Sequence, residues 1–75
     1  MQLGDIISAE RKELRISQEE LAYRLQRSQD WVSLVERNKQ EPTLDDLENL
    51  ARELKSKVIK DISDGRAFQE LKKRM

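Results

Sequence analysis

The segment from Ser17 to Arg37, SQEELAYRLQRSQDWVSLVER, predicts two short helices joined by a tight turn. Ser17 with Glu20 three residues later is a capping box, and it opens a helix whose apolar residues are Leu21, Ala22 and Leu25. A second helix start follows at Ser28, with the negative charge of Asp30 in its first turn. Helices this short are not stable alone in water, so the pair has to pack against other elements. Two short helices at a steep angle are a common way to place one helix in a DNA major groove.

The rest of the chain also has helical patterning. A first helix is expected over residues 3–14, on the apolar positions Leu3, Ile6, Ile7 and Leu14. The capped pair then occupies residues 18–25 and 29–37, and residues 38–42 form a loop because Pro42 disfavours a helical residue before it. Thr43 with Asp46 is another capping box. It opens an amphipathic helix that carries Leu44, Leu47, Leu50, Ala51 and Leu54.

The C-terminal third predicts two more helices. Ser56 is expected to cap a fifth helix with Val58, Ile59 and Ile62, and Ser63–Gly65 is expected to break it. A last amphipathic helix would then carry Ala67, Phe68 and Leu71. The expected fold is therefore all-α: a compact helix-turn-helix domain over residues 1–62, with the helix-turn-helix at 18–37, and an extra C-terminal helix over 63–75.

The composition limits the kinds of site this chain can contain. Its 75 residues make one small domain, and its net charge is zero, whereas DNA-binding domains usually carry a basic excess. The chain has no cysteine and no histidine, so we expect no metal site and no cofactor. No apolar run approaches the ~20 residues that span a bilayer, and nothing resembles a signal peptide. We therefore expect a cytoplasmic protein with no membrane partner.

The helix expected over residues 29–37 has an inward and an outward face. At 100° per residue, the inward arc holds Val32, Val35 and Glu36. The outward arc holds Asp30, Ser33, Leu34 and Arg37, with Gln29 at its leading edge. Any amphipathic helix with a solvated face shows the same division, so periodicity alone leaves the function open.

Five features together match a known pattern: RKEL at 11–14, SQEELA at 17–22, Ser33, VERNKQEP at 35–42 and LENLARELK at 47–55. On these residues the chain resembles the lambda-repressor/Cro-like helix-turn-helix family, also called the xenobiotic-response-element family, from residue 3 to about residue 59. The resemblance implies a five-helix domain that binds double-stranded DNA.

The resemblance also implies which residues would contact DNA: Gln18, Ser28, Gln29, Asp30, Ser33, Leu34, Arg37, Lys39 and Gln40. Gln18 would bond phosphate and brace the start of the reading helix. Gln29 would reach a base edge, where a glutamine can bond adenine. Asp30 and Leu34 would also face bases, Ser33 a base or a phosphate, and the loop with Lys39 and Gln40 would hold phosphate.

A structural ion pair between Arg11 and Glu36 is implied as well, and such a pair fixes geometry more than it adds stability. The alternative is two unpaired charges on the surface. Trp31 is expected to pack against the fourth helix or the loop, and the alternative is a position along the sugar-phosphate backbone.

The sequence departs from the family at its turns. Arg15, Gln26 and Asn38 stand where glycine is usual, and Arg27 stands where the family has an apolar residue. A positive φ at Gln26 would cost about 1 kcal/mol, whereas asparagine is the next-best residue after glycine in such a turn. These departures affect stability more directly than recognition.

The outward face of the 29–37 helix has little positive charge, so a monomer should bind DNA weakly. Five apolar residues near the C-terminus exceed what so small a domain needs to cover itself: Val58, Ile59, Ile62, Phe68 and Leu71. A two-fold homodimer would bury them and place two reading helices about 34 Å apart, at the half-sites of a pseudo-palindrome. The alternative is that the last helix folds back on its own core.

These observations favour a sequence-specific DNA-binding transcriptional regulator of prokaryotic or phage type, acting as a homodimeric repressor. The alternative is a DNA-binding antitoxin whose main role is to neutralise a toxin partner. An enzyme is not expected, because the adjacent carboxylates Glu19–Glu20 and Asp45–Asp46 lie at helix starts, where capping explains them.

Overall fold

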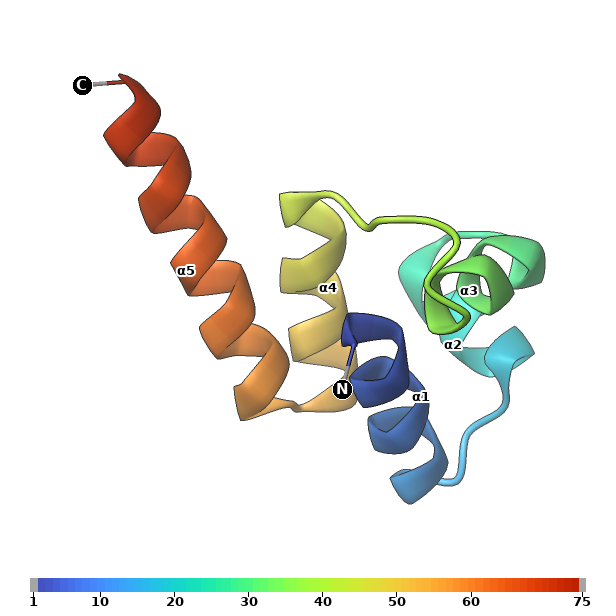
Figure 1. The fold of residues 1–75 in the computed structure, drawn as a ribbon. Coiled ribbons are helices and arrows are strands. Elements are labelled where there is room, and N and C mark those ends of the chain that lie inside the picture. Colours follow the sequence, from blue (N-terminus) through green and yellow to red (C-terminus); the bar gives the residue numbers. More distant parts are fainter. Residues whose placement is uncertain (1, 75) are drawn as a thin grey trace.

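The computed structural model describes residues 2–74, and that range contains five helices and no strand. They are α1 (Leu3–Glu13), α2 (Gln18–Leu25), α3 (Gln29–Glu36), α4 (Leu44–Leu54) and α5 (Lys57–Arg74). The expected all-α fold is confirmed, and the bounds of α1 to α4 agree with the predicted ones to within one residue. Helices α1 to α4 form a compact group, while α5 runs antiparallel to α4 along the outer edge and projects beyond it (Figure 1).

The predicted break at Ser63–Gly65 is wrong, because α5 continues without interruption from Lys57 to Arg74. Ser63 is only 2% exposed, and Arg66, on the next turn, reaches the carbonyl of Pro42 over 3.4 Å. Packing against the rest of the domain thus continues through the expected break and outweighs the low helix propensity of serine and glycine. The expected boundary between residues 62 and 63 consequently falls inside one helix.

One apolar core joins the five helices. Its buried members are Ile7, Leu21, Ala22, Val32, Val35, Leu47, Leu50, Ala51, Leu54 and Ile59. Ile59 is 0% exposed, and Ile62 is partly buried against the same core. The first half of α5 therefore folds back on the domain, and Ile59 is not available to the dimer surface in which it was expected.

Four helices end in the same left-handed turn. Arg15, Gln26, Asn38 and Lys55 have φ of 60°, 56°, 61° and 51°. In each case the N–H of the following residue returns to a carbonyl of the last helical turn; Arg27 N lies 2.9 Å from Ala22 O, for example. This is the Schellman motif. The positive φ expected at Gln26 is confirmed, and the equivalent turn at Lys55 was not anticipated.

Candidate nucleic-acid interface

Serine hydroxyls set the starts of the two helices in the helix-turn-helix. Ser17 Oγ accepts from Glu20 N at 3.0 Å, and Ser28 Oγ accepts from Trp31 N at 3.1 Å. The predicted capping box at Ser17 is only half formed, because the Glu20 carboxylate accepts from Arg24 Nε at 3.2 Å instead. Each cap satisfies one backbone N–H that would otherwise lack a partner in the first turn. The local sequence thus determines where α2 and α3 begin.

A buried ion pair ties α1 to α3. Arg11 donates to both carboxylate oxygens of Glu36, with Nε–Oε2 at 2.6 Å and Nη2–Oε1 at 3.0 Å. The two side chains are only 11% and 6% exposed. Arg11 also donates to the carbonyl of Ile16 at 2.8 Å, which holds the chain leading into α2. The predicted pair is therefore present, and its two-pronged geometry fixes the orientation of both helices.

Gln18 extends this network to α2, since its Nε2 donates to Glu36 Oε1 at 3.1 Å. The family resemblance implies that Gln18 braces the start of α3. In the structure Gln18 instead contacts Glu36, in the last turn of that helix. Burial raises the pKa of Glu36, whereas the hydrogen bonds from Arg11 and Gln18 and the positive charge of Arg11 lower it. Together they hold the pKa below its ordinary value of 4.5. At neutral pH the carboxylate is ionised and joins three helices.

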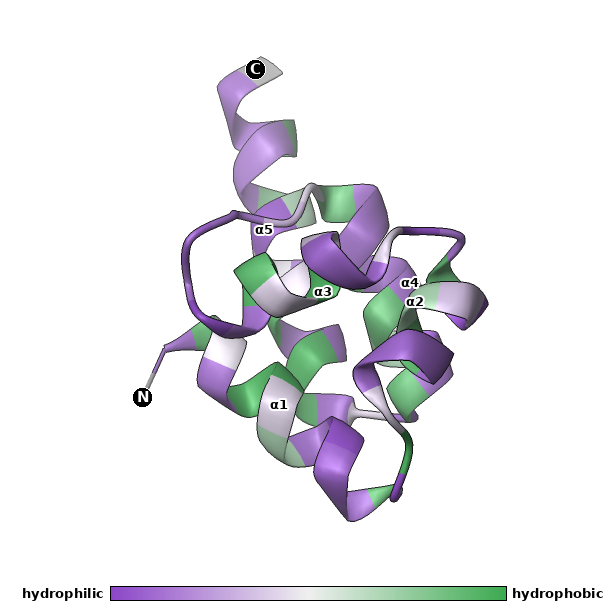
Figure 2. Cartoon of the chain, turned by 90° about the vertical axis from the view of Figure 1, so that its right-hand side faces the viewer, coloured by the Kyte–Doolittle hydropathy of each residue, from purple (hydrophilic) through white to green (hydrophobic). Residues whose placement is uncertain are grey.

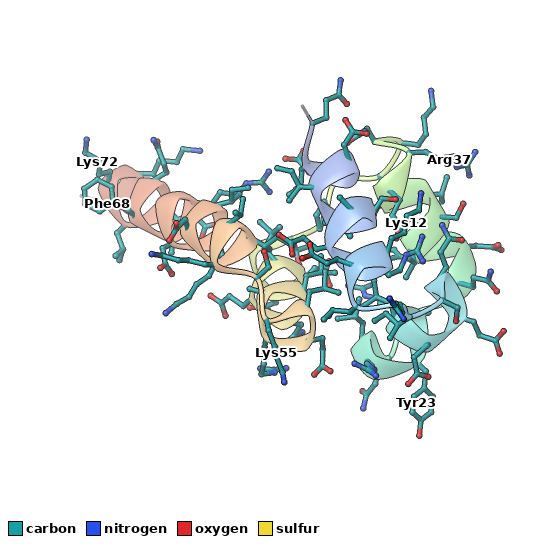
Figure 3. The ribbon with its side chains drawn as sticks, turned by 90° about the horizontal axis from the view of Figure 1, so that it is seen from below. Lys12, Tyr23, Arg37, Lys55, Phe68 and Lys72 are labelled. Atoms are coloured by element: carbon teal, nitrogen blue, oxygen red, sulfur yellow. The ribbon has the colours of Figure 1, made fainter. Side chains whose placement is uncertain are left out.

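The outward face of α3 is separated from the core as predicted. Val32, Val35 and Glu36 are buried, and the opposite side presents the expected residues to solvent. Ser28, Gln29 and Asp30 are exposed at the N-terminal end, and Ser33 and Leu34 are half-buried in the middle. Arg37, just past the last turn, points out from the molecule (Figure 3), and its Nε lies 3.3 Å from the carbonyl of Ser33.

The loop from Arg37 to Thr43 continues this surface with hydrophilic residues (Figure 2). Lys39 and Gln40 are both exposed in it. The start of α1 lies against the end of α3, where Gly4 N donates to Asn38 Oδ1 at 2.8 Å. A Cβ at residue 4 would lie within 2.6 Å of Asn38 Oδ1 and Glu36 O, and closer still to Val35 O. Only glycine permits this approach.

The turn between α2 and α3 is held by Arg27. Its Nη2 lies 2.6 Å from Asp46 Oδ1, and its guanidinium carbon lies 4.7 Å from the centre of the Trp31 ring. Asp46 also closes the capping box with Thr43 that was predicted for α4. Burial raises the pKa of Asp46, but the bonds from Thr43 and Arg27 outweigh it and hold the pKa below 3.8. Trp31 is partly buried against the core, so the packing interpretation of this residue is confirmed.

Sequence reasoning missed three residues that position the outward surface: Gly4, Arg27 and Arg66. Arg66 of α5 reaches the loop after α3, with Nη1 at 3.4 Å from Pro42 O and Nη2 at 3.4 Å from Glu41 Oε1. This contact could not be predicted while a break was expected at Ser63–Gly65. Only a continuous helix places Arg66 on the same side as Ile59 and Ile62. No local sequence signal indicates a role for Gly4, because the residues that it contacts are more than thirty positions away in the sequence.

A family model described as a helix-turn-helix domain matches residues 2–55. The chain belongs to the helix-turn-helix domain family. The match spans α1 to α4 with all the turns between them and ends just before α5. Membership supports a role as a DNA-binding regulator, and it agrees with the geometry of α2 and α3. No significant match was found among curated proteins or among solved structures.

Two further findings concern other kinds of site. Among residues 2–74, no helix is both long and apolar enough to cross a membrane. In the same range, no group of three or more histidine, cysteine, aspartate and glutamate side chains is arranged to hold a metal ion.

Proposed function

We propose that this chain is a cytoplasmic, sequence-specific transcriptional repressor of the lambda-repressor/Cro-like type, which binds a pseudo-palindromic operator as a homodimer. In this proposal the N-terminal end of α3 enters the major groove. Gln29 and Asp30 read base edges there, Leu34 offers an apolar contact, and the loop with Lys39 and Gln40 holds phosphate.

The observation that carries the proposal is the network centred on Glu36. A reading helix has to be held at a fixed angle, because base contacts are lost when it rotates or shifts. Glu36 receives hydrogen bonds from α1 and α2 while belonging to α3, so one carboxylate orients the helix from within. This leaves Gln29 and Asp30, which are exposed in the first turn at the other end of α3, free to meet a ligand.

The charges around α3 shape the expected mode of binding. Arg37 and Lys39 are exposed at its C-terminal end, while Asp30 is exposed at its N-terminal end. The cations can neutralise phosphate, and the carboxylate can accept from cytosine N4 but repels phosphate. One copy therefore has few cations to attach it to DNA, which is the reason for proposing two copies at one operator.

Selection from a random DNA pool followed by fluorescence anisotropy tests the proposal. We expect Gln29→Ala to lower affinity for the selected sequence by about 1–3 kcal/mol, or roughly fivefold to 150-fold, and to leave binding to unrelated DNA unchanged. The matched control is Gln69→Ala, an exposed glutamine on α5. An equal loss on every sequence would mean that Gln29 does not read bases. A pool in which no sequence is enriched would overturn the proposal.

A DNA-binding antitoxin is the second candidate. It is favoured by apolar side chains that α5 leaves at the surface, since Val58, Phe68 and Leu71 are 50%, 60% and 58% exposed. Co-expression with the neighbouring gene separates the candidates. A tight complex that inhibits the neighbour's toxicity favours the antitoxin, and repression of its own promoter by the purified chain alone favours the repressor.

A further inference from the structure

One side of α5 carries four exposed residues at the spacing of a helix-helix contact: Asp61, Gly65, Phe68 and Lys72. They follow one another at intervals of four, three and four. At about 100° per residue they lie within an arc of about 60°, the narrow seam typical of paired helices. We call these four residues the α5 stripe.

The stripe lies on the side of α5 that faces away from the domain. Ile59 and Ser63 face the domain and are 0% and 2% exposed, whereas all four stripe residues are exposed. The second half of α5 also projects beyond α4 (Figure 1). Phe68 and Lys72 lie together at that projecting end, with Lys72 Nζ 5.4 Å from the centre of the Phe68 ring (Figure 3).

Gly65 gives the stripe a flat centre. Glycine in the interior of a helix lowers helix stability. A Cβ at this residue would meet nothing within 4 Å, so no contact inside the domain requires glycine here. A residue without a side chain does allow a bulky group from another molecule to approach the helix closely.

We propose that the α5 stripe is the contact surface for a second copy of this chain, with the two α5 helices antiparallel. In this arrangement Phe68 of each copy packs on Gly65 of the other, and Asp61 of each copy pairs with Lys72 of the other. The inference rests on the homodimer of the proposed function and gives it an interface. The four residues are self-complementary in this one register, as a two-fold contact requires.

Charge selects the antiparallel orientation. A parallel pair in register would place Asp61 against Asp61 and Lys72 against Lys72, and like charges facing each other across a helix pair are repulsive. The antiparallel pair instead forms two attractive pairs, one on each side of the aromatic contacts. Complementary charge thus favours a second copy as the occupant of this face.

The interface changes the expected spacing of half-sites. In Figure 1, α4 lies between α5 and α3. At about 8–10 Å per packed helix pair, the two α4 helices of such a dimer lie about 24–30 Å apart, and each α3 lies farther out. The spacing of the two reading helices is then set by the α5 contact and exceeds that of the two α4 helices.

Sedimentation equilibrium of the full chain without DNA tests the stripe. We expect Asp61→Lys and Lys72→Asp each to weaken self-association about tenfold or more, because each change replaces two attractive pairs with two repulsive ones. Both changes in one chain should restore the dissociation constant to near the original value. An equimolar mixture of the two single variants should form a heterodimer. Lys60→Asp, the same charge change off the stripe, is the matched control and should have no effect.

Three results would overturn the stripe: single variants that associate like the original, a double variant that stays weak, or a chain that remains monomeric at millimolar concentration. Anisotropy on the selected DNA with the same variants keeps this outcome separate from the proposed function. If the single variants bind the selected DNA specifically and also self-associate like the original chain, the proposed contact at the stripe is rejected and the DNA-binding role is retained. If the original chain binds DNA without sequence selectivity, the proposed function is rejected, whatever the self-association of the stripe variants.

Discussion

Glu36 is the side chain on which α1, α2 and α3 converge, and its charge is what the neighbouring donors require. Replacing it with glutamine keeps the shape but leaves Arg11 as a buried cation without a counter-ion. We expect Glu36→Gln to lower the free energy of unfolding by about 3 kcal/mol, as for other buried pairs that lose one partner. Urea denaturation at pH 7 measures the change. The matched control is Glu48→Gln, an exposed carboxylate in the interior of α4, which should change stability by less than about 0.5 kcal/mol.

The same residue makes stability depend on pH. Because the folded protein holds the pKa of Glu36 below 4.5, its contribution is complete above that pH and is lost as pH falls through the lower, folded-state pKa. The original chain should therefore lose more stability between about pH 5 and pH 2 than Glu36→Gln does. Asp46 titrates in both proteins, so the difference between them isolates Glu36. Parallel pH profiles would contradict the role assigned to this carboxylate.

Gln26 occupies a left-handed turn that glycine adopts without strain. We expect Gln26→Gly to raise the free energy of unfolding by about 0.5–1 kcal/mol, because relief of the strain exceeds the entropy that glycine adds to the unfolded chain. Glu48→Gly in the middle of α4 should do the opposite, by about 1 kcal/mol. Thermal unfolding of the original chain and the two variants under one condition shows whether each substitution raises or lowers stability. A Gln26→Gly variant that is less stable would show that the side chain contributes more than its backbone costs.

At this scale, most caps and the Arg11–Glu36 pair were predicted, but for different reasons. A cap depends on residues three apart, so Ser28 and Thr43 could be found from the sequence alone. The pair joins residues twenty-five apart and followed only from a family resemblance. The contact of Arg27 with Asp46 had neither kind of signal, because it depends on how α2 meets α4.

The approach of α1 to the end of α3 depends on the absence of one side chain. Gly4→Ala would push a methyl group into the carbonyls of Val35 and Glu36, which belong to helix backbone and cannot move away cheaply. We expect it to lower the free energy of unfolding by about 2 kcal/mol, in the range of other overpacked sites. Gly65→Ala is the matched control: its Cβ meets open space, so it should raise stability by about 0.5–1 kcal/mol through helix propensity. Chemical denaturation at a low protein concentration compares the two.

The α5 helix shows where element prediction from sequence failed. Serine and glycine at 63–65 favour a break in the helix. The helical spacing of Ile59, Ile62 and Arg66 on either side of these residues favours a continuous helix. Burial of Ile59 and Ser63 against the domain decided in favour of the continuous helix. The four left-handed turns formed by residues other than glycine are a second case in which the backbone departs from the local preference of the residue type.

The whole molecule has no net charge, so any affinity for DNA depends on where its cations lie. Lysines and arginines are present in equal number to aspartates and glutamates. Five of the arginines are paired with carboxylates, and three of them, Arg11, Arg27 and Arg66, join separate parts of the fold. Arg37 and Lys39 are exposed beside α3, so they are the cations best placed to meet phosphate.

Salt dependence of binding tests that distribution. Four cations per dimer, each neutralising one phosphate, predict a slope of log affinity against log salt of about −3 to −4. Lys39→Ala should reduce the slope by about 2 in a dimer, because each copy loses one phosphate contact. Lys60→Ala removes an exposed lysine from α5, across the molecule from α3, and should leave the slope unchanged. Anisotropy titrations on the selected operator at several salt concentrations provide the measurement. A flat response would exclude DNA as the principal ligand, and equal effects of the two lysines would place the phosphate contacts away from the α3 surface.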